Sequence, residues 1–307
     1  MSGMESNAEK TRRATWLLLG LVVPWLAAPV SAQEGRAPAT ARHTLWKVQG
    51  ESNAVYLAGS VHVLRKENYP LAAPIEAAFS NSAIAVFETD IDALEDPETA
   101  QKIRGKGRLP DGETLRQQLS PEVYAAFAEH VKNAGLPERM FDPLSPSMAI
   151  LSLAVIDLEK LGFDPEYGMD KYFFRRARKD AKQIVALETV EFQIGLATDF
   201  TREEGEMLMK TTLRDIDKLK QEFGDVLKAW ETGNADELEK LLNEATQEAP
   251  VIFKRFVADR NRQWLPKIQE LARGKENAIV IVGAAHLVGK EGVVELLKKR
   301  GLKVTQE

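Results

Sequence analysis

The 307-residue chain contains no cysteine. This absence excludes disulfide bonds, thiol catalysis and cysteine-ligated zinc. A metal site in this protein must therefore use His, Asp or Glu side chains. Histidine is also scarce, because the chain has only four.

The chain also lacks an excess of positive charge. It has 41 Lys and Arg residues against 46 Asp and Glu residues, which gives a formal net charge of -5. Nucleic-acid binding rests on clustered basic residues, so nucleic acid is not an expected partner. Hydrophobic residues make up 44% of the sequence, which is enough for a sizeable core.

Only one long apolar run occurs, and it lies near the N-terminus. Residues Thr15–Pro29 follow a short basic segment, and Val30–Ala32 place small residues before a cleavage point at Gln33. The run is shorter than the roughly 20 residues of a membrane-spanning helix, and Pro24 interrupts it. The pattern indicates a cleavable export signal.

The sequence thus divides into three parts. We expect a signal peptide over residues 1–32, a short linker over residues 33–42 and one domain over residues 43–307. The mature protein is expected to be periplasmic or secreted, without a stable membrane span.

Two apolar stretches near opposite ends of the chain share the pattern glycine, two residues, histidine. AVYLAGSVHVL contains His62, and IVIVGAAHLVG contains His286. One such pattern alone is weak, because a lone histidine is more often a core or capping residue. Two copies, each following a predicted buried strand, favour a functional role.

Two other apolar stretches end in Glu-Thr, namely AVFETD with Glu88 and VALETV with Glu188. Apolar strands that alternate with helices predict an α/β fold with a mixed sheet. In open α/β sheets, ligands bind at the carboxyl ends of the strands. We therefore expect His62, Glu88, Glu188 and His286 to face one crevice.

Two imidazoles and two carboxylates in one crevice suit a divalent metal such as zinc, manganese or cobalt. A metal with an open position lowers the pKa of its bound water to about 7. In this hypothesis His62, His286, Glu88 and Glu188 are the candidate ligands, and one of the two glutamates also accepts a proton from water.

The segment ADRNRQWLPKI adds Arg260 and Asn261, which lie together on a predicted amphipathic helix. Arginine can stabilise an oxyanion, and asparagine can donate a hydrogen bond to the same group. The alternative is structural, because Arg260 could pair with Glu88 or Glu188.

Three further expectations concern secondary structure. Residues 44–50 and 54–60 alternate as a hairpin would. The polar, glycine-rich residues 96–112 predict a mobile excursion. Residues 201–230 predict one long charged amphipathic helix.

The ordered set LWKVQGESNAVYLAGSVHVL, AVFETD, GMDKYF, VALETVEFQ, RNRQW and IVIVGAAHLVG resembles the TraB/GumN family, which includes the Tiki-type proteases. The resemblance covers residues 43–305, and its specificity lies in the order and spacing of the motifs. It implies a fold like that of the erythromycin-esterase/ChaN group, with two related halves around a central crevice and many flanking helices.

The resemblance also implies a metal-dependent peptidase mechanism, as in the Tiki branch. It implies that Asp170, in the Gly168–Asp170 element, orients the site, with Met169 where the family has leucine. The residues that match the family's other motifs are His62, His286, Glu88, Glu188, Arg260 and Asn261.

The sequence therefore predicts an exported metal-dependent hydrolase, with a peptide or small molecule as substrate. One alternative is a metal-free, esterase-like hydrolase that uses His62 or His286 as a base and water as the nucleophile. The other is a non-catalytic protein that binds haem or a peptide.

Overall fold

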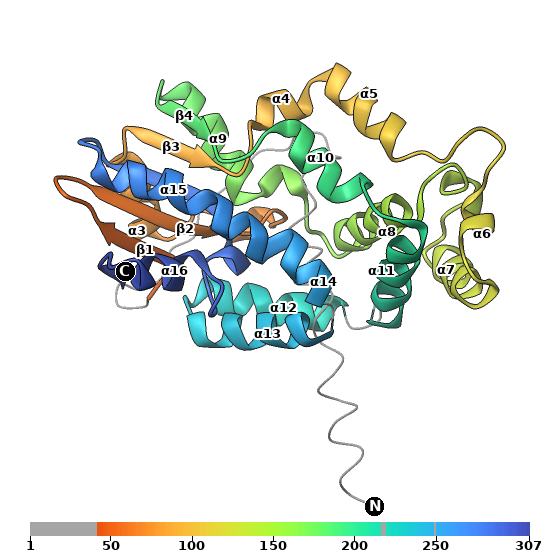
Figure 1. The fold of residues 1–307 in the computed structure, drawn as a ribbon. Helices are drawn as coiled ribbons and strands as arrows, with labels where there is room; N and C mark the ends of the chain where they lie inside the picture. Colours follow the sequence, from red (N-terminus) through yellow and green to blue (C-terminus); the bar gives the residue numbers. More distant parts are fainter. Residues whose placement is uncertain (1–41, 216–218, 249) are drawn as a thin grey trace, which may run out of the picture.

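The computed structural model describes residues 42–215, 219–248 and 250–307, so the predicted signal peptide lies outside the described residues. Its centre is a six-stranded sheet with the strand order β4-β3-β5-β2-β1-β6 (Figure 1). The strands are β1 (Leu45–Gln49), β2 (Ala54–Ser60), β3 (Ile84–Phe87), β4 (Gln183–Ala186), β5 (Ala278–Gly283) and β6 (Val304–Gln306).

The sheet is mixed, as predicted. Strands β2, β5, β3 and β4 are parallel, whereas β1 pairs antiparallel with both β2 and β6. The expected hairpin is β1–β2. All six residues of β5 are buried, as expected for a parallel strand that is covered on both faces. The chain has an α/β fold.

The strands that carry similar motifs are neighbours. Strands β2 and β5, which precede the two histidines, pair with each other. Strands β3 and β4, which precede the two glutamates, also pair, and β5 joins β3. The repeated motifs therefore lie in one interleaved sheet, and all four strands end at the same edge.

Helices from distant parts of the sequence cover the sheet. Helix α15 (Asp259–Arg273) crosses the sheet in the view of Figure 1, where it packs against β2 and α16 (Val293–Lys299). Helix α9 (Met169–Lys179) packs against β3 and β4. Its Phe173 stacks on Phe79 of α3 (Ala73–Ser80), with ring centroids 4.7 Å apart.

A second group of helices lies to one side of the sheet (Figure 1). Helix α8 is the apolar centre of this group and packs against α6, α10 and α11, while α11 also contacts α7. Their bounds are α6 (Leu115–Gln118), α7 (Pro121–Asn133), α8 (Pro146–Lys160), α10 (Val190–Thr198) and α11 (Arg202–Asp215).

The prediction of a mobile excursion over residues 96–112 is wrong for its first half. Helix α4 (Ile91–Glu95) is followed directly by α5 (Pro97–Lys106). The Asp96 carboxylate accepts hydrogen bonds from the backbone N–H groups of Glu98 and Thr99, and Pro97 takes the first helical position. Asp-Pro is a strong helix start, and it outweighs the glycines that follow.

The charged segment 201–230 is described as α11 and α12 (Leu219–Glu231), and residues 216–218 between them lie outside the described residues. Helix α12 pairs with α13 (Ala235–Glu248). After α14 (Pro250–Phe253) comes a π-helical segment, η5 (Lys254–Ala258), which leads into α15. Within the described ranges, no helix is both long and apolar enough to cross a membrane.

Candidate functional site

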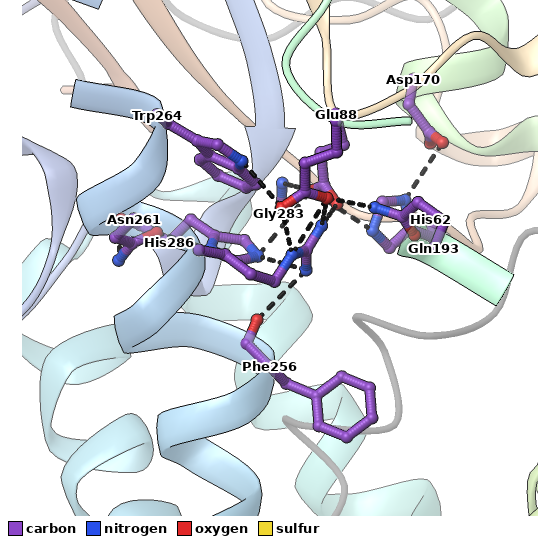
Figure 2. A network of polar contacts seen from close by, with 11 residues as sticks. His62, Glu88, Asp170, Gln193, Phe256, Asn261, Trp264, Gly283 and His286 are labelled. Atoms are coloured by element: carbon purple, nitrogen blue, oxygen red, sulfur yellow. Dashed lines mark hydrogen bonds and ion pairs between the residues drawn. The ribbon is translucent and has the colours of Figure 1, made fainter. Parts of the chain in front are cut away.

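The four side chains predicted at the strand ends come together, as Figure 2 shows for three of them. His62 follows β2, Glu88 follows β3, Glu188 follows β4, and His286 ends the short 3-10 turn η6 after β5. The pairing of β3 with β4 continues past the strands, because the Glu188 N–H donates to the Glu88 carbonyl at 2.8 Å. The parallel sheet therefore delivers both glutamates to one place.

Arg260 lies at the centre of this group and is completely buried. Its Nη2 donates to Glu88 Oε2 at 2.6 Å and to Glu188 Oε2 at 2.8 Å, and its Nε donates to Glu188 Oε1 at 2.9 Å. Its Nη1 contacts the Phe256 carbonyl of the π-helical segment and His286 Nε2, both at 3.1 Å. The predicted ion pair is confirmed, and it involves both glutamates.

Asn261 sets the protonation of His286. The Asn261 Nδ2 donates to the carbonyls of His286 at 3.2 Å and Glu291 at 2.8 Å. Its Oδ1 must therefore be the acceptor for His286 Nδ1, 2.7 Å away. With the hydrogen on Nδ1, the neutral imidazole presents a bare Nε2, which accepts from Arg260.

His62 has a similar arrangement on the other side of Glu88. Its Nδ1 lies 3.1 Å from Oδ2 of Asp170, at the start of α9, in an ion-pair contact that does not count as a hydrogen bond. Its Nε2 lies 3.9 Å from Glu88 Oε1. The Nε2 of His286 lies 3.9 Å from the same oxygen, so both imidazoles face one carboxylate atom.

Glu188 is held more tightly than Glu88. The Trp264 Nε1 donates to its Oε1 at 2.8 Å, and the Gln193 Nε2 donates to its Oε2 at 2.7 Å, in addition to the Arg260 bonds. Trp264 and Gln193 are not among the site residues predicted from the sequence. Trp264 could have been found, because it lies four residues after Arg260 and so on the same helix face.

Burial and charge shift the pKa values of three of these groups. Burial disfavours charge on His62, but Asp170 and Glu88 outweigh it and raise the pKa of His62 to about 9. Burial and the Arg260 charge lower the pKa of His286 to about 3. Burial would raise the pKa of Glu88, but Arg260 holds that pKa well below its usual range.

A small cavity of about 30 Å³ adjoins these groups. The apolar part of its wall includes two side chains of α4. The predicted crevice is therefore narrow and mostly closed in this conformation. The residues that line it are His62, Phe87, Glu88, Thr89, Ile91, Leu94, Asp170, Gln193 and Ile281.

The residue types at the site suit a divalent metal, but their donor atoms lie too far apart in this conformation to bind one. Metal-bound imidazoles place their second nitrogen against an oxygen acceptor, as both histidines do here with Asp170 and Asn261. The separations of 3.9 Å from Glu88 exceed the roughly 3.4 Å between donors in a tetrahedral site. Among the described residues, no group of three or more His, Asp or Glu side chains could hold a metal as it stands. To bind a metal, these donors would have to move closer together. His286 Nε2 would also have to give up its contact with Arg260 Nη1 and bind the metal instead.

The family is decided by a comparison of the whole sequence. The model of the TraB/PrgY/gumN family matches residues 44–306, nearly the entire described chain. The chain belongs to the TraB/PrgY/gumN family. The resemblance found in the sequence motifs is thereby confirmed, and the family match spans all the site residues.

Two bacterial relatives align over most of their length. One, named "Uncharacterized protein YbaP", from Escherichia coli (strain K12), is 21% identical over 243 residues, which cover 79% of this chain and 87% of the relative. An "Uncharacterized protein" of Treponema pallidum (strain Nichols) is 20% identical over 309 residues, or 94% of this chain and 90% of the relative. No solved structure matches the chain significantly.

Proposed function

We propose that the protein is an exported, metal-dependent hydrolase that cleaves a peptide, or a small molecule with a similar carbonyl group, by adding water. One observation carries the proposal. The Nε2 atoms of His62 and His286 each lie 3.9 Å from Glu88 Oε1, and the Nδ1 atoms of both rings face oxygen acceptors.

The residues that would hold the metal are His62 and His286, through Nε2, with Glu88 between them. The balance of buried charge supports this choice. Arg260 pairs with two of the three carboxylates at the site, Glu88 and Glu188, whereas the third, Asp170, faces His62. Two negative charges therefore remain once a metal has displaced the proton of His62 and both imidazoles are neutral. Buried charges require compensation, and a divalent cation supplies it. When bound, such a metal would supply Lewis-acid polarisation of a carbonyl or a water.

In the proposed reaction the oxygen of water bonds to the carbonyl carbon and the bond from that carbon to the leaving nitrogen breaks. The proton released by water ends on the leaving nitrogen. Asp170 lines the cavity, and its Oδ1 has no hydrogen-bond partner among the described residues, so its carboxylate can carry this proton. Glu88 is less suited, because Arg260 and the Gly283 N–H bind its two oxygens. Glu188 is unsuited, because Arg260, Trp264 and Gln193 already bind its two oxygens. Its role is to hold Arg260.

The oxyanion role predicted for Arg260 requires a rearrangement. All five of its N–H groups are engaged by Glu88, Glu188, His286 and the Phe256 carbonyl. Arg260 becomes a donor to substrate only when it releases one of these partners, and His286 is the partner that a metal would take from it.

Two alternatives are less well supported by the geometry. A metal-free hydrolase needs a free imidazole base, but the raised pKa of His62 keeps it protonated at neutral pH, and Arg260 binds the lone pair of His286. A haem group is far larger than the cavity of about 30 Å³ beside His62.

The test is metal titration of the chelator-treated protein with zinc, manganese and cobalt by calorimetry, followed by a screen of peptide substrates. We expect one equivalent of metal to bind the wild type, and binding to weaken at least a hundredfold in His62→Ala and in His286→Ala. His130→Ala is the matched control, because His130 pairs with Asp157 at 2.8 Å, away from the site. A wild type that binds no metal, with circular dichroism showing it folded, would overturn the proposal.

Export is a separate part of the proposal. It rests on the basic segment, the apolar run and the small residues before Gln33. N-terminal sequencing of the protein recovered from the periplasm or the medium should begin at Gln33. An intact N-terminus, or protein confined to the cytoplasm, would contradict export without affecting the metal site.

A further inference from the structure

Thr89 has a buried hydroxyl that the proposed mechanism has not used. It directly follows Glu88 at the end of β3 and is only 5% exposed. Its Oγ1 has no hydrogen-bond partner among the described residues. Thr89 lines the cavity of about 30 Å³ together with His62, Glu88 and Asp170.

The second Glu-Thr motif shows what this hydroxyl would otherwise do. Thr189 follows Glu188 in the same way, and its Oγ1 accepts a hydrogen bond from the Phe192 N–H at 3.2 Å, which caps helix α10. After Thr89 the next helix, α4, is capped by Asp90, which accepts from the Ala93 N–H at 3.1 Å. Thr89 is thereby released from capping and remains available to a ligand.

Within the part of the chain that the structure describes, half of the buried polar atoms without a hydrogen-bond partner belong to residues around that cavity. Eight buried side-chain atoms in the described residues lack a hydrogen-bond partner, and four of the eight belong to residues that line it. Buried polar groups are rarely left without a partner. The four atoms are Thr89 Oγ1, Asp170 Oδ1, and Nδ1 and Nε2 of His62, of which Nδ1 still has its ion-pair contact with Asp170 Oδ2.

The size and lining of the cavity favour water as the ligand. An ordered water needs space of roughly 10–15 Å³ and two to four polar partners, and the cavity of about 30 Å³ offers both. Its other walls include the apolar side chains of Phe87, Ile91, Leu94 and Ile281. These apolar walls offer no hydrogen bond, so a bound water can be oriented only by the polar side chains of the lining.

We propose that Thr89, together with Asp170, holds the water that the hydrolase consumes. The inference rests on the proposed function. The two hydrogens of this water point to Thr89 Oγ1 and Asp170 Oδ1, which leaves its oxygen lone pairs free to meet a carbonyl carbon. Thr89 therefore orients the water, and it is not required for the binding of the remainder of the substrate.

Crystal structures of the wild type, Thr89→Val and Thr89→Ser at a resolution that shows ordered water test the site directly. Valine keeps the shape of threonine without the hydroxyl, and serine keeps the hydroxyl. We expect a water within hydrogen-bond distance of Oγ1 in the wild type and in Thr89→Ser, and its loss in Thr89→Val. A wild type without this water, or a Thr89→Val variant that retains it at full occupancy, overturns the inference.

Kinetics with a substrate from the peptide screen test the consequence. We expect Thr89→Val to lower kcat about tenfold to a hundredfold, as for the loss of one orienting contact, with little change in KM and with recovery in Thr89→Ser. Thr212→Val is the matched control, because Thr212 has the other unpartnered buried threonine hydroxyl among the described residues, in helix α11. Wild-type kcat in Thr89→Val overturns the inference.

The two proposals fail in different ways. A wild type that binds no metal and cleaves no substrate overturns the hydrolase, and with it the consumption of this water. The crystal structures still decide whether Thr89 holds a water. A wild type that is active, with a fully active Thr89→Val variant, leaves the hydrolase standing and removes the role of Thr89.

Discussion

Oδ1 of Asn261 lies 2.7 Å from Nδ1 of His286 and fixes which ring nitrogen carries the hydrogen. The amide of Asn261 cannot flip, because its Nδ2 already serves the carbonyls of His286 and Glu291. A backbone-anchored amide thus keeps His286 Nε2 bare and directed toward Glu88.

Replacing Asn261 with leucine should therefore impair both the site and the fold. We expect metal affinity to fall about tenfold to a hundredfold, the usual loss for a partner of a metal-binding histidine. We also expect the free energy of unfolding to fall by about 1–3 kcal/mol, because two carbonyls lose a buried donor. Nitrogen NMR shifts of the His286 ring should show that the hydrogen is no longer confined to Nδ1. Unchanged ring shifts would contradict the role of Asn261.

Two neighbouring arginines should differ widely in their contribution to stability. Arg260→Leu leaves Glu88 and Glu188 buried without a cation, so we expect the free energy of unfolding to fall by about 3–5 kcal/mol. Arg262 is half exposed and pairs with Asp259 and Glu291 at the surface. Arg262→Leu should therefore change stability by less than about 1 kcal/mol.

Urea denaturation of the metal-free protein measures both effects. The triple variant Arg260→Leu/Glu88→Gln/Glu188→Gln removes the unpaired charges and should recover part of the loss. Equal stability of the two single arginine variants would show that the buried ion pairs do not hold the site together.

The residues at the ends of the strands could be predicted from the sequence because a short stretch of neighbouring residues is enough to specify a strand and its end. A continuous apolar run that ends in a polar residue specifies a buried parallel strand and its carboxyl end. Such runs predict that His62, Glu88, Glu188 and His286 lie at one edge of the sheet. The sequence also allows Arg260 to pair with one glutamate, and the structure extends this pairing to both.

The remaining features depend on tertiary packing. The sequence does not specify that Arg260 uses all five N–H groups, or that Gln193 reaches back across a helical turn to Glu188. It also does not distinguish Thr89 from Thr189. Thr189 itself caps the helix that follows it, whereas Asp90 takes this role after Thr89. The helix at Pro97–Lys106 departs from the prediction because its Asp-Pro start outweighs the glycines that follow.

The two site histidines should give stability opposite dependences on pH in the metal-free protein. The pKa of His62 rises from 6.5 to about 9 on folding, so the stabilisation is complete below pH 6.5 and is lost as pH rises toward 9. The pKa of His286 falls from 6.5 to about 3, so its contribution is present above pH 6.5 and is lost as pH falls toward 3.

Urea unfolding of the chelated protein at pH 4.5, 6.5 and 9 checks these signs. His62→Gln should lose less stability than the wild type between pH 6.5 and 9, by up to about 3 kcal/mol. His286→Gln should lose less between pH 6.5 and 4.5. If each variant follows the wild-type curve across its own range, the assigned protonation states are wrong.

Gly168 is required where the chain passes directly against the backbone of His62. A Cβ atom at this position would lie 2.4 Å from the His62 carbonyl oxygen and 2.9 Å from Asp170 Oδ1. The backbone of Gly168 is in an ordinary region, with a φ of -52°, so the constraint is space and not conformation. The first of these contacts is to backbone, which cannot move aside without shifting the histidine loop.

Gly168→Ala should therefore damage the site more than the addition of a single methyl group suggests. We expect a loss of about 1–3 kcal/mol in the free energy of unfolding from overpacking, together with weaker metal binding, because the His62 loop and Asp170 are displaced. Gly105→Ala is the matched control, since a Cβ there meets nothing within 4 Å. In the last turn of α5 that change should be neutral or stabilising by about 0.4–1 kcal/mol. Thermal unfolding and metal titration of both variants make the comparison, and a Gly168→Ala variant with wild-type metal affinity would show that the His62 loop is not held by this contact.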